Sequence, residues 1–346
     1  PICSGSLTQA GTNTVTLTGS NSYDGGTTIS AGTLALGASN VLANTGAVTV
    51  AGGTLDIGAY SDTVGTVTLS AGAITGTTGV LTGSAYSITN SSGTTNVTAI
   101  LAGTANLEKS GAGTAVLSAA NTYTGTTGVS AGTLVLSGNN AAATGGMTLS
   151  GGITRFESLA SINGTARDVT LNAGGTVVFG PSFAAGNIPS GLARIVTTSA
   201  GVIAADNYDT TNLDFNTPGL TAAYLGAVGS VSYTGTLIPN GTTYRLGGGG
   251  GTLTMANTNA ITGAGNSLVV NGNVNLPGSN NHGGGTTLIT GTLAVGNGSS
   301  LGGGTLTING GTMQSTDGTA HVLANALAQA RAMAAEADLL DIASRF

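Results

Sequence analysis

The chain has 346 residues, of which 61 are glycine and only 6% are charged, and its formal net charge is −6. Its seven basic residues are scattered singly, which excludes nucleic-acid binding through a basic patch. No apolar run reaches the roughly 18 residues that a membrane-spanning helix needs, so we expect no membrane insertion. Low charge with a mean hydropathy of +0.30 also argues against a disordered coil.

The N-terminal end offers two small clues. The chain begins with Pro1 and shows no signal peptide, so we expect a processed product or a fragment. Cys3 is the only cysteine, which excludes an intrachain disulfide and a four-thiolate metal site. Cys3 is either an inert residue or a cross-link to a neighbouring chain.

Short alternations of apolar and polar residues run through the first half of the chain. Examples are Val15–Leu17, Thr33–Leu36, Val48–Val50, Thr66–Leu69, Val116–Leu117 and Thr133–Leu136. Alternation with period two in β-branched residues predicts strands with one buried face, and Gly, Asn and Ser steps predict turns between them. Short, evenly spaced strands fit either a β-solenoid or an antiparallel sandwich.

A phrase of 17 residues occurs three times and favours the solenoid. Its copies are NSYDGGTTISAGTLALG (21–37), NTYTGTTGVSAGTLVLS (121–137) and NNHGGGTTLITGTLAVG (280–296), and each is followed by a shorter echo. A recurring phrase marks a repeat architecture. We therefore expect stacked coils with inward Leu and Val columns, and His282 in the third copy takes the place of Tyr23 and Tyr123.

Two later segments break the pattern. Residues 181–246 hold six of the thirteen aromatic residues and four of the six prolines, so we expect an excursion or side lobe there. Ala320–Phe346 lacks Gly and Pro and repeats Leu and Ala at helical spacing, which predicts an amphipathic helix that caps the last coil or docks another subunit. The predicted parts are solenoid with two copies (1–180), excursion (181–246), solenoid with the third copy (247–316) and C-terminal helix (317–346).

The second copy, with Asn121, Tyr123, Gly125 and the Gly132-Thr133-Leu134 step, closely resembles the autotransporter-associated β-strand repeat, also called the passenger-associated transport repeat. Val15–Gly37 resembles it too, and Leu101–Thr114 resembles the lead-in of such repeats. The resemblance covers about half of the chain. It implies a β-helical passenger, secreted or exposed on the bacterial surface, that acts in adhesion or as an extended scaffold, and it supplies no catalytic residues.

Few residues of this chain are candidates for catalysis or for binding a ligand. Asp206, Asp209 and Asp214, with Arg194 upstream, form the one acidic concentration before the C-terminal segment. They predict either turns closed by Asp side chains or a weak glycan site, in which the acids act with aromatic rings. That glycan site comprises Tyr208, Tyr224, Tyr233, Asp206 and Asp209. His282 and His321 lie far apart, and the phosphate-loop, calcium-repeat and nucleophile-elbow patterns are absent, so we expect no catalytic residue, metal or cofactor.

Three hypotheses follow, in descending order. The first is a structural β-solenoid subunit of a fibre, sheath or scaffold that joins other copies of itself head to tail, with no enzymatic activity. Its intersubunit contacts would involve Cys3, Leu323, Leu327 and Phe346. The second is an adhesin stalk whose aromatic lobe binds glycans or a host surface. The third is a β-helical polysaccharide-degrading enzyme.

Overall fold

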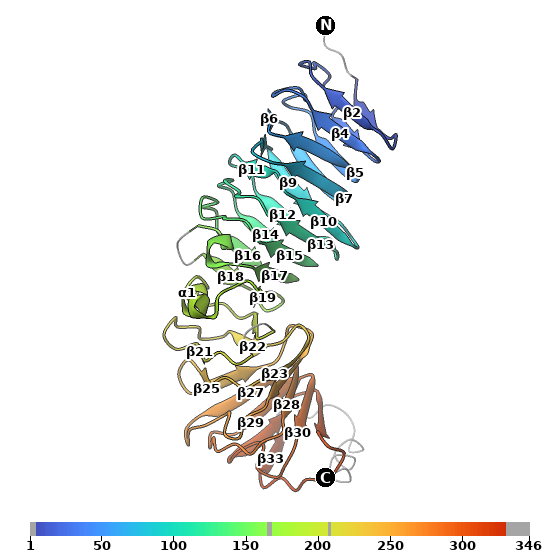
Figure 1. Ribbon diagram of the computed structural model, residues 1–346. Coiled ribbons are helices and arrows are strands. Elements are labelled where there is room, and N and C mark those ends of the chain that lie inside the picture. Colours follow the sequence, from blue (N-terminus) through green and yellow to red (C-terminus); the bar gives the residue numbers. More distant parts are fainter. Residues whose placement is uncertain (1–4, 165–167, 207–208, 330–346) are drawn as a thin grey trace. The chain divides into compact units, whose positions relative to one another are not determined.

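The computed structural model describes residues 5–164, 168–206 and 209–329, and these form an all-β parallel β-solenoid (Figure 1). The chain divides into two compact units, Pro1–Val196 (unit 1) and Thr197–Phe346 (unit 2). The fold class predicted from the repeated phrase is therefore confirmed. Figure 1 shows successive strands of each unit lying side by side, as expected when each coil bonds to the one before it.

Unit 1 contains nineteen strands and three short helical segments in its described residues. They are β1 (Leu7–Gln9), β2 (Thr14–Leu17), β3 (Thr27–Ile29), β4 (Thr33–Leu36), β5 (Val48–Gly58), β6 (Asp62–Thr63), β7 (Thr66–Gly76), β8 (Val80–Thr82), β9 (Ala85–Ile88), β10 (Thr94–Val97), β11 (Ile100–Ala102), β12 (Leu107–Lys109), β13 (Thr114–Leu117), β14 (Thr127–Val129), β15 (Thr133–Leu136), β16 (Met147–Leu149), β17 (Ile153–Phe156), η1 (Leu159–Ser161), β18 (Val169–Leu171), β19 (Thr176–Phe179), η2 (Ala185–Asn187) and α1 (Ile188–Leu192).

Two ladders of parallel strands form the main walls of unit 1. One runs through β1, β3, β5, β7, β9, β12, β14, β16 and β18. The other runs through β2, β4, β5, β7, β10, β13, β15, β17 and β19. The long strands β5 and β7 belong to both ladders, and β6, β8 and β11 form a third, short wall. Parallel pairing in fixed register places equivalent residues of successive coils above one another.

The core of unit 1 consists of inward columns produced by this register. One column on the second wall reads Val15, Leu34, Leu55, Ile74, Val97, Leu117, Leu136, Phe156 and Phe179. All of these except Val15, which is 42% exposed, are buried. Burying one such side chain contributes about 1.5 to 3 kcal/mol. The apolar positions of the repeated phrase therefore supply the main stabilisation of the coils.

Unit 2 contains fourteen strands in its described residues. They are β20 (Val202–Ala204), β21 (Leu213–Asp214), β22 (Tyr224–Gly226), β23 (Ser230–Tyr233), β24 (Leu237–Ile238), β25 (Thr243–Leu246), β26 (Thr252–Met255), β27 (Ser267–Asn271), β28 (Asn273–Leu276), β29 (Thr286–Thr290), β30 (Thr292–Val295), β31 (Thr305–Ile308), β32 (Thr312–Ser315) and β33 (Ala326–Gln329).

The aromatic-rich stretch 181–246 contributes strands to the parallel ladders. Within unit 2, β20, β22 and β25 lead into β27, β29, β31 and β33, while β23 leads into β26, β28, β30 and β32. The pair β21 and β24 forms a separate short wall. The stretch also holds α1, which ends unit 1. Its sequence departs from the phrase, but its strands still stack on the coils that follow.

The predicted C-terminal helix is wrong where the structure describes it. Ala326–Gln329 forms strand β33, in parallel register with β31, and Leu327 lies opposite Leu306. Pairing with an existing strand edge supplies backbone hydrogen bonds to this short segment, which overrides the helical spacing of Leu and Ala. Residues 330–346 of that prediction lie outside the described residues. Among the described residues the α-helix is α1, and none of their helices is long and apolar enough to span a membrane.

A glycine at one corner of each copy explains the Gly-Thr-Leu step of the phrase. Gly32, Gly132 and Gly291 have φ of +60°, +67° and +79°. A Cβ on Gly132 would lie 2.2 Å from the Gly111 carbonyl oxygen of the preceding coil. The close stacking of coils at this corner and the left-handed backbone both require glycine.

Candidate functional site

The residues predicted to form a glycan site do not present a set of exposed rings. Tyr233 is 1% exposed, and its hydroxyl donates to the Thr211 and Thr236 carbonyls at 2.8 Å each. Tyr224 is half-buried on β22, and Tyr208 lies outside the described residues. Since Tyr233 points into the core, it cannot stack on a ligand while the coil is intact.

Two of the three acidic side chains of the same stretch bond to backbone amides. Asp206 accepts the Val228 amide at 2.9 Å, and Asp209 is exposed, with its backbone carbonyl accepting the Thr234 amide. Asp214 accepts the Asn216 amide at 2.7 Å and the Thr217 amide at 3.1 Å. This is the turn closed by an Asp side chain that the sequence analysis weighed against a ligand site. Partial desolvation alone would raise the pKa of Asp214, but the bond from the Thr217 hydroxyl and these two amide bonds outweigh it and lower that pKa.

Arg194 pairs with a different acid from the three considered. Its guanidinium lies 3.7 Å from Asp168, within unit 1. Burial raises the pKa of Asp168, and the Arg194 charge opposes that rise. Sequence order placed Arg194 just upstream of Asp206, but the coil brings it next to the start of β18.

Two of the four residues predicted for subunit contacts are described. Leu323 is half-buried, and Leu327 on β33 is 50% exposed. Cys3 and Phe346 lie outside the described residues.

The repeated phrase builds the same corner in each of its three copies. The Tyr23 hydroxyl lies 2.6 Å from Thr27 Oγ1, and the Tyr123 hydroxyl lies 2.8 Å from Thr127 Oγ1. His282 Nε2 lies 3.0 Å from Thr286 Oγ1, so histidine makes the bond that tyrosine makes in the other copies. The sequence expectation that His282 replaces a repeat tyrosine is confirmed.

The first residue of the phrase joins neighbouring coils. Asn121 Oδ1 accepts the Leu101 amide of the preceding coil at 3.0 Å, and its Nδ2 donates to Asn140 Oδ1 of the next coil at 3.0 Å. Asn280 likewise accepts the Ile261 amide at 2.9 Å and donates to the Ser300 carbonyl at 2.7 Å. This column of buried amides satisfies backbone groups that the strands leave unpaired at the corner. The recurrence of Asn in the phrase was the signal for it.

Asp62 and Lys109 are ionisable side chains buried in these coils. Asp62 Oδ2 accepts the Val41 amide at 2.9 Å and the Leu42 amide at 3.0 Å, and burial raises its pKa. Lys109 Nζ donates to the Gly111 carbonyl, and burial lowers the pKa of Lys109. Gln9, at the same place in the first repeat, donates to the Gly11 carbonyl at 2.9 Å. The amine of Lys109 therefore makes the same contact that the uncharged amide of Gln9 makes in the first repeat.

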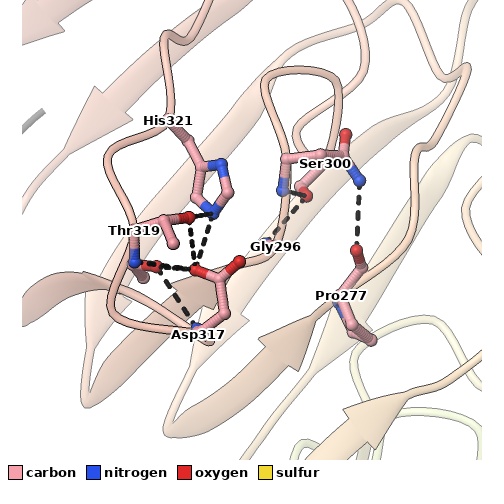
Figure 2. Close-up of polar contacts among 8 residues, drawn as sticks. Pro277, Gly296, Ser300, Asp317, Thr319 and His321 are labelled. Atoms are coloured by element: carbon pink, nitrogen blue, oxygen red, sulfur yellow. Dashed lines mark hydrogen bonds and ion pairs between the residues drawn. The ribbon is translucent and has the colours of Figure 1, made fainter.

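A turn after β32 gathers an acid, an imidazole and two hydroxyls (Figure 2). Asp317 Oδ1 accepts the Ser315 hydroxyl at 2.6 Å, the Thr319 hydroxyl at 2.8 Å and His321 Nε2 at 3.0 Å. These bonds lower the pKa of the exposed Asp317 carboxyl well below its usual range.

This turn is not arranged as a catalytic triad. A triad needs the acid on one ring nitrogen and the nucleophile on the other. Here both Asp317 Oδ1 and Thr319 Oγ1, at 3.0 and 3.4 Å, approach the same nitrogen, Nε2. Both hydroxyls also donate to the carboxylate, so the turn is a closed hydrogen-bonded loop. Across residues 5–164, 168–206 and 209–329, no group of three or more His, Cys, Asp or Glu is placed to hold a metal ion.

Comparison with known proteins gives one family. The model of the passenger-associated-transport-repeat matches residues 7–36, 107–136 and 130–155. The matched residues make up about a quarter of the chain and leave out the third copy at 280–296, so the match is narrower than the resemblance indicated. No curated protein and no solved structure matches the chain.

Proposed function

Because this chain carries passenger-associated transport repeats and folds as a parallel β-solenoid, we propose that it is a structural segment of a secreted passenger on the bacterial surface. The role is mechanical and adhesive scaffolding, without enzymatic activity. The observation that carries the proposal is the continuous parallel pairing of unit 1, where nine strands stack in each main wall. In such a wall each coil is the template for the next.

The polar residues of the phrase support the same role. Asn121 and Asn280 join one coil to the next, and the Tyr, His and Thr side chains of the corner bond to each other inside the coil. The side chains that the repeat retains are thus engaged in holding coils together. Tyr233, one of the three rings of the alternative glycan site, is buried, which favours the scaffold over the adhesin with an aromatic lobe.

We further propose that copies join end to end. Among the described residues, β1 pairs with β3 alone and β2 with β4 alone, while β32 pairs with β30 alone and β33 with β31 alone. Val15 on β2 and Leu327 on β33 stand in core columns yet are 42% and 50% exposed. An open strand edge above an exposed apolar column can accept a further parallel strand, and a head-to-tail contact propagates as a filament.

Negative-stain electron microscopy over a dilution series tests this proposal. Regular filaments should persist on dilution, and Val15→Lys should shorten them because a charge in the core column opposes stacking. Ser20→Lys, at an exposed position of the same coil, is the matched control and should leave filaments intact. Isolated particles at every concentration would contradict end-to-end joining.

A further inference from the structure

His282 is a fully buried histidine in the third copy of the phrase. It is 0% exposed, and its Nε2 lies 3.0 Å from Thr286 Oγ1. The two other copies place tyrosine here, with the same bond to a threonine four residues on. The substitution keeps the contact but puts a group that titrates near neutral pH into the core.

The hydrogen bonds favour one position for the proton of His282. Thr286 Oγ1 lies 3.5 Å from the Leu301 carbonyl oxygen, to which it can only donate, so a proton on His282 Nε2 satisfies both contacts of the threonine hydroxyl. The neutral ring therefore carries its proton on Nε2, and Nδ1 is bare. Within the described part of the chain Nδ1 is buried and has no hydrogen-bond partner. A second proton would have to bind at Nδ1, where the described residues supply no hydrogen-bond acceptor.

Among the described residues, no carboxylate forms an ion pair with His282. Gly302 packs against the ring, where a Cβ would lie 2.6 Å from Nδ1, and Nε2 bonds to the uncharged hydroxyl of Thr286. The ionisable Tyr244 lies two strands from Thr286 in the same column of the ladder. Burial alone lowers the pKa of His282, with no contribution from a neighbouring charge.

We propose that the coil from Asn280 to Gly302 is an acid-sensitive segment of the solenoid, opened by protonation of His282. The folded coil binds the proton less well than the open coil, so its stability falls as the pH drops below the ordinary histidine value of 6.5. Opening would release the joins that Asn280 makes to Ile261 and Ser300. Acid thus weakens unit 2 at one defined coil.

Hydrogen exchange of the full chain, read by mass spectrometry and corrected for intrinsic rates, tests the proposal. Between about pH 8 and pH 5 the opening equilibrium of amides in 280–302 should rise by up to about 30-fold, the limit for a site that stays neutral when folded. Amides of the equivalent coil around Tyr123 should show no such rise.

Two variants decide the cause. His282→Tyr restores the residue of the other copies, and His282→Gln keeps a neutral donor should the phenol fit poorly; both should abolish the rise. His321→Gln, which removes the histidine of the Asp317 turn, is the matched control and should retain it. A flat response in the unaltered chain, or a rise that survives in both His282 variants, would overturn the proposal.

Discussion

Asp62 carries a buried carboxylate at a corner where other coils use an amide. Its Oδ2 accepts a hydrogen bond from the Val41 amide. In the same way, Asn121 accepts one from the Leu101 amide and Asn280 accepts one from the Ile261 amide. The second oxygen of Asp62, Oδ1, is buried without a hydrogen-bond partner within the described residues. The ionised form is therefore costly here. Burial also raises the pKa of Tyr23, and the Asp62 carboxylate raises it further.

Replacing Asp62 by Asn should stabilise unit 1 at neutral pH. Because the pKa of Asp62 is raised in the folded chain, its favourable contribution is complete below the unfolded value of 3.8 and is lost as the pH rises through the folded value. At pH 7 an amide avoids the buried charge, and we expect the free energy of unfolding to rise by about 1 kcal/mol. Urea denaturation followed by circular dichroism at about pH 7 and pH 4.5 measures this.

The matched control for Asp62 is Asp24→Asn, at an exposed carboxylate of a nearby turn. It should leave the dependence of stability on pH unchanged. If Asp62→Asn lowers stability at pH 7, the unpaired oxygen has a partner that the structure does not show, and the reasoning fails.

At the scale of elements, the corner glycine of the phrase does not tolerate a side chain. Gly132→Ala would combine a left-handed φ of +67° with a Cβ 2.2 Å from the Gly111 oxygen and 2.4 Å from the Gly113 oxygen. We expect a loss of about 2 kcal/mol or more in the free energy of unfolding. Gly19→Ala, which meets nothing within 4 Å, should cost far less. Equal denaturation midpoints for the two variants would count against the corner argument.

The strands and the parallel stacking could be predicted because the phrase repeats the inward positions, such as Leu34 and Leu134. The segment from Ala320 could not, since Leu323 and Leu327 have helical spacing and only the edge of β31 decides that Ala326–Gln329 is extended. The five-residue helix α1 contains Pro189 and Gly191, which gave no helical signal.

The polar contacts were only partly predictable, because they depend on which coils are neighbours. The place of His282 followed from aligning three copies of the phrase. The pairing of Arg194 with Asp168 did not, since their 26-residue separation becomes a contact only when the coil closes. Tyr233 shares its strand with exposed Ser232, and the sequence alone did not tell which of the two faces inward.

At the scale of the molecule, the segment after β19 packs within unit 1. Phe179 stacks on Phe183 with ring centroids 4.7 Å apart, and Ile188 and Leu192 of α1 are buried. The Arg194–Asp168 ion pair holds the segment after α1 to the same unit. A fragment of residues 1–196 should therefore fold alone with a single cooperative thermal transition, followed by far-ultraviolet circular dichroism. The full chain should add a second transition, and a fragment without β-structure would refute the independence of unit 1.

The parallel walls of unit 1 also have a consequence for tension. Backbone hydrogen bonds in these walls run from coil to coil, so a pull along the stacking direction loads them in line. These hydrogen bonds should break a few at a time, one coil after another. Each released coil of about 20 residues would add roughly 65 Å of contour length in place of a rise of about 4.8 Å. A solenoid of this design should yield by many small steps and keep its remaining coils folded.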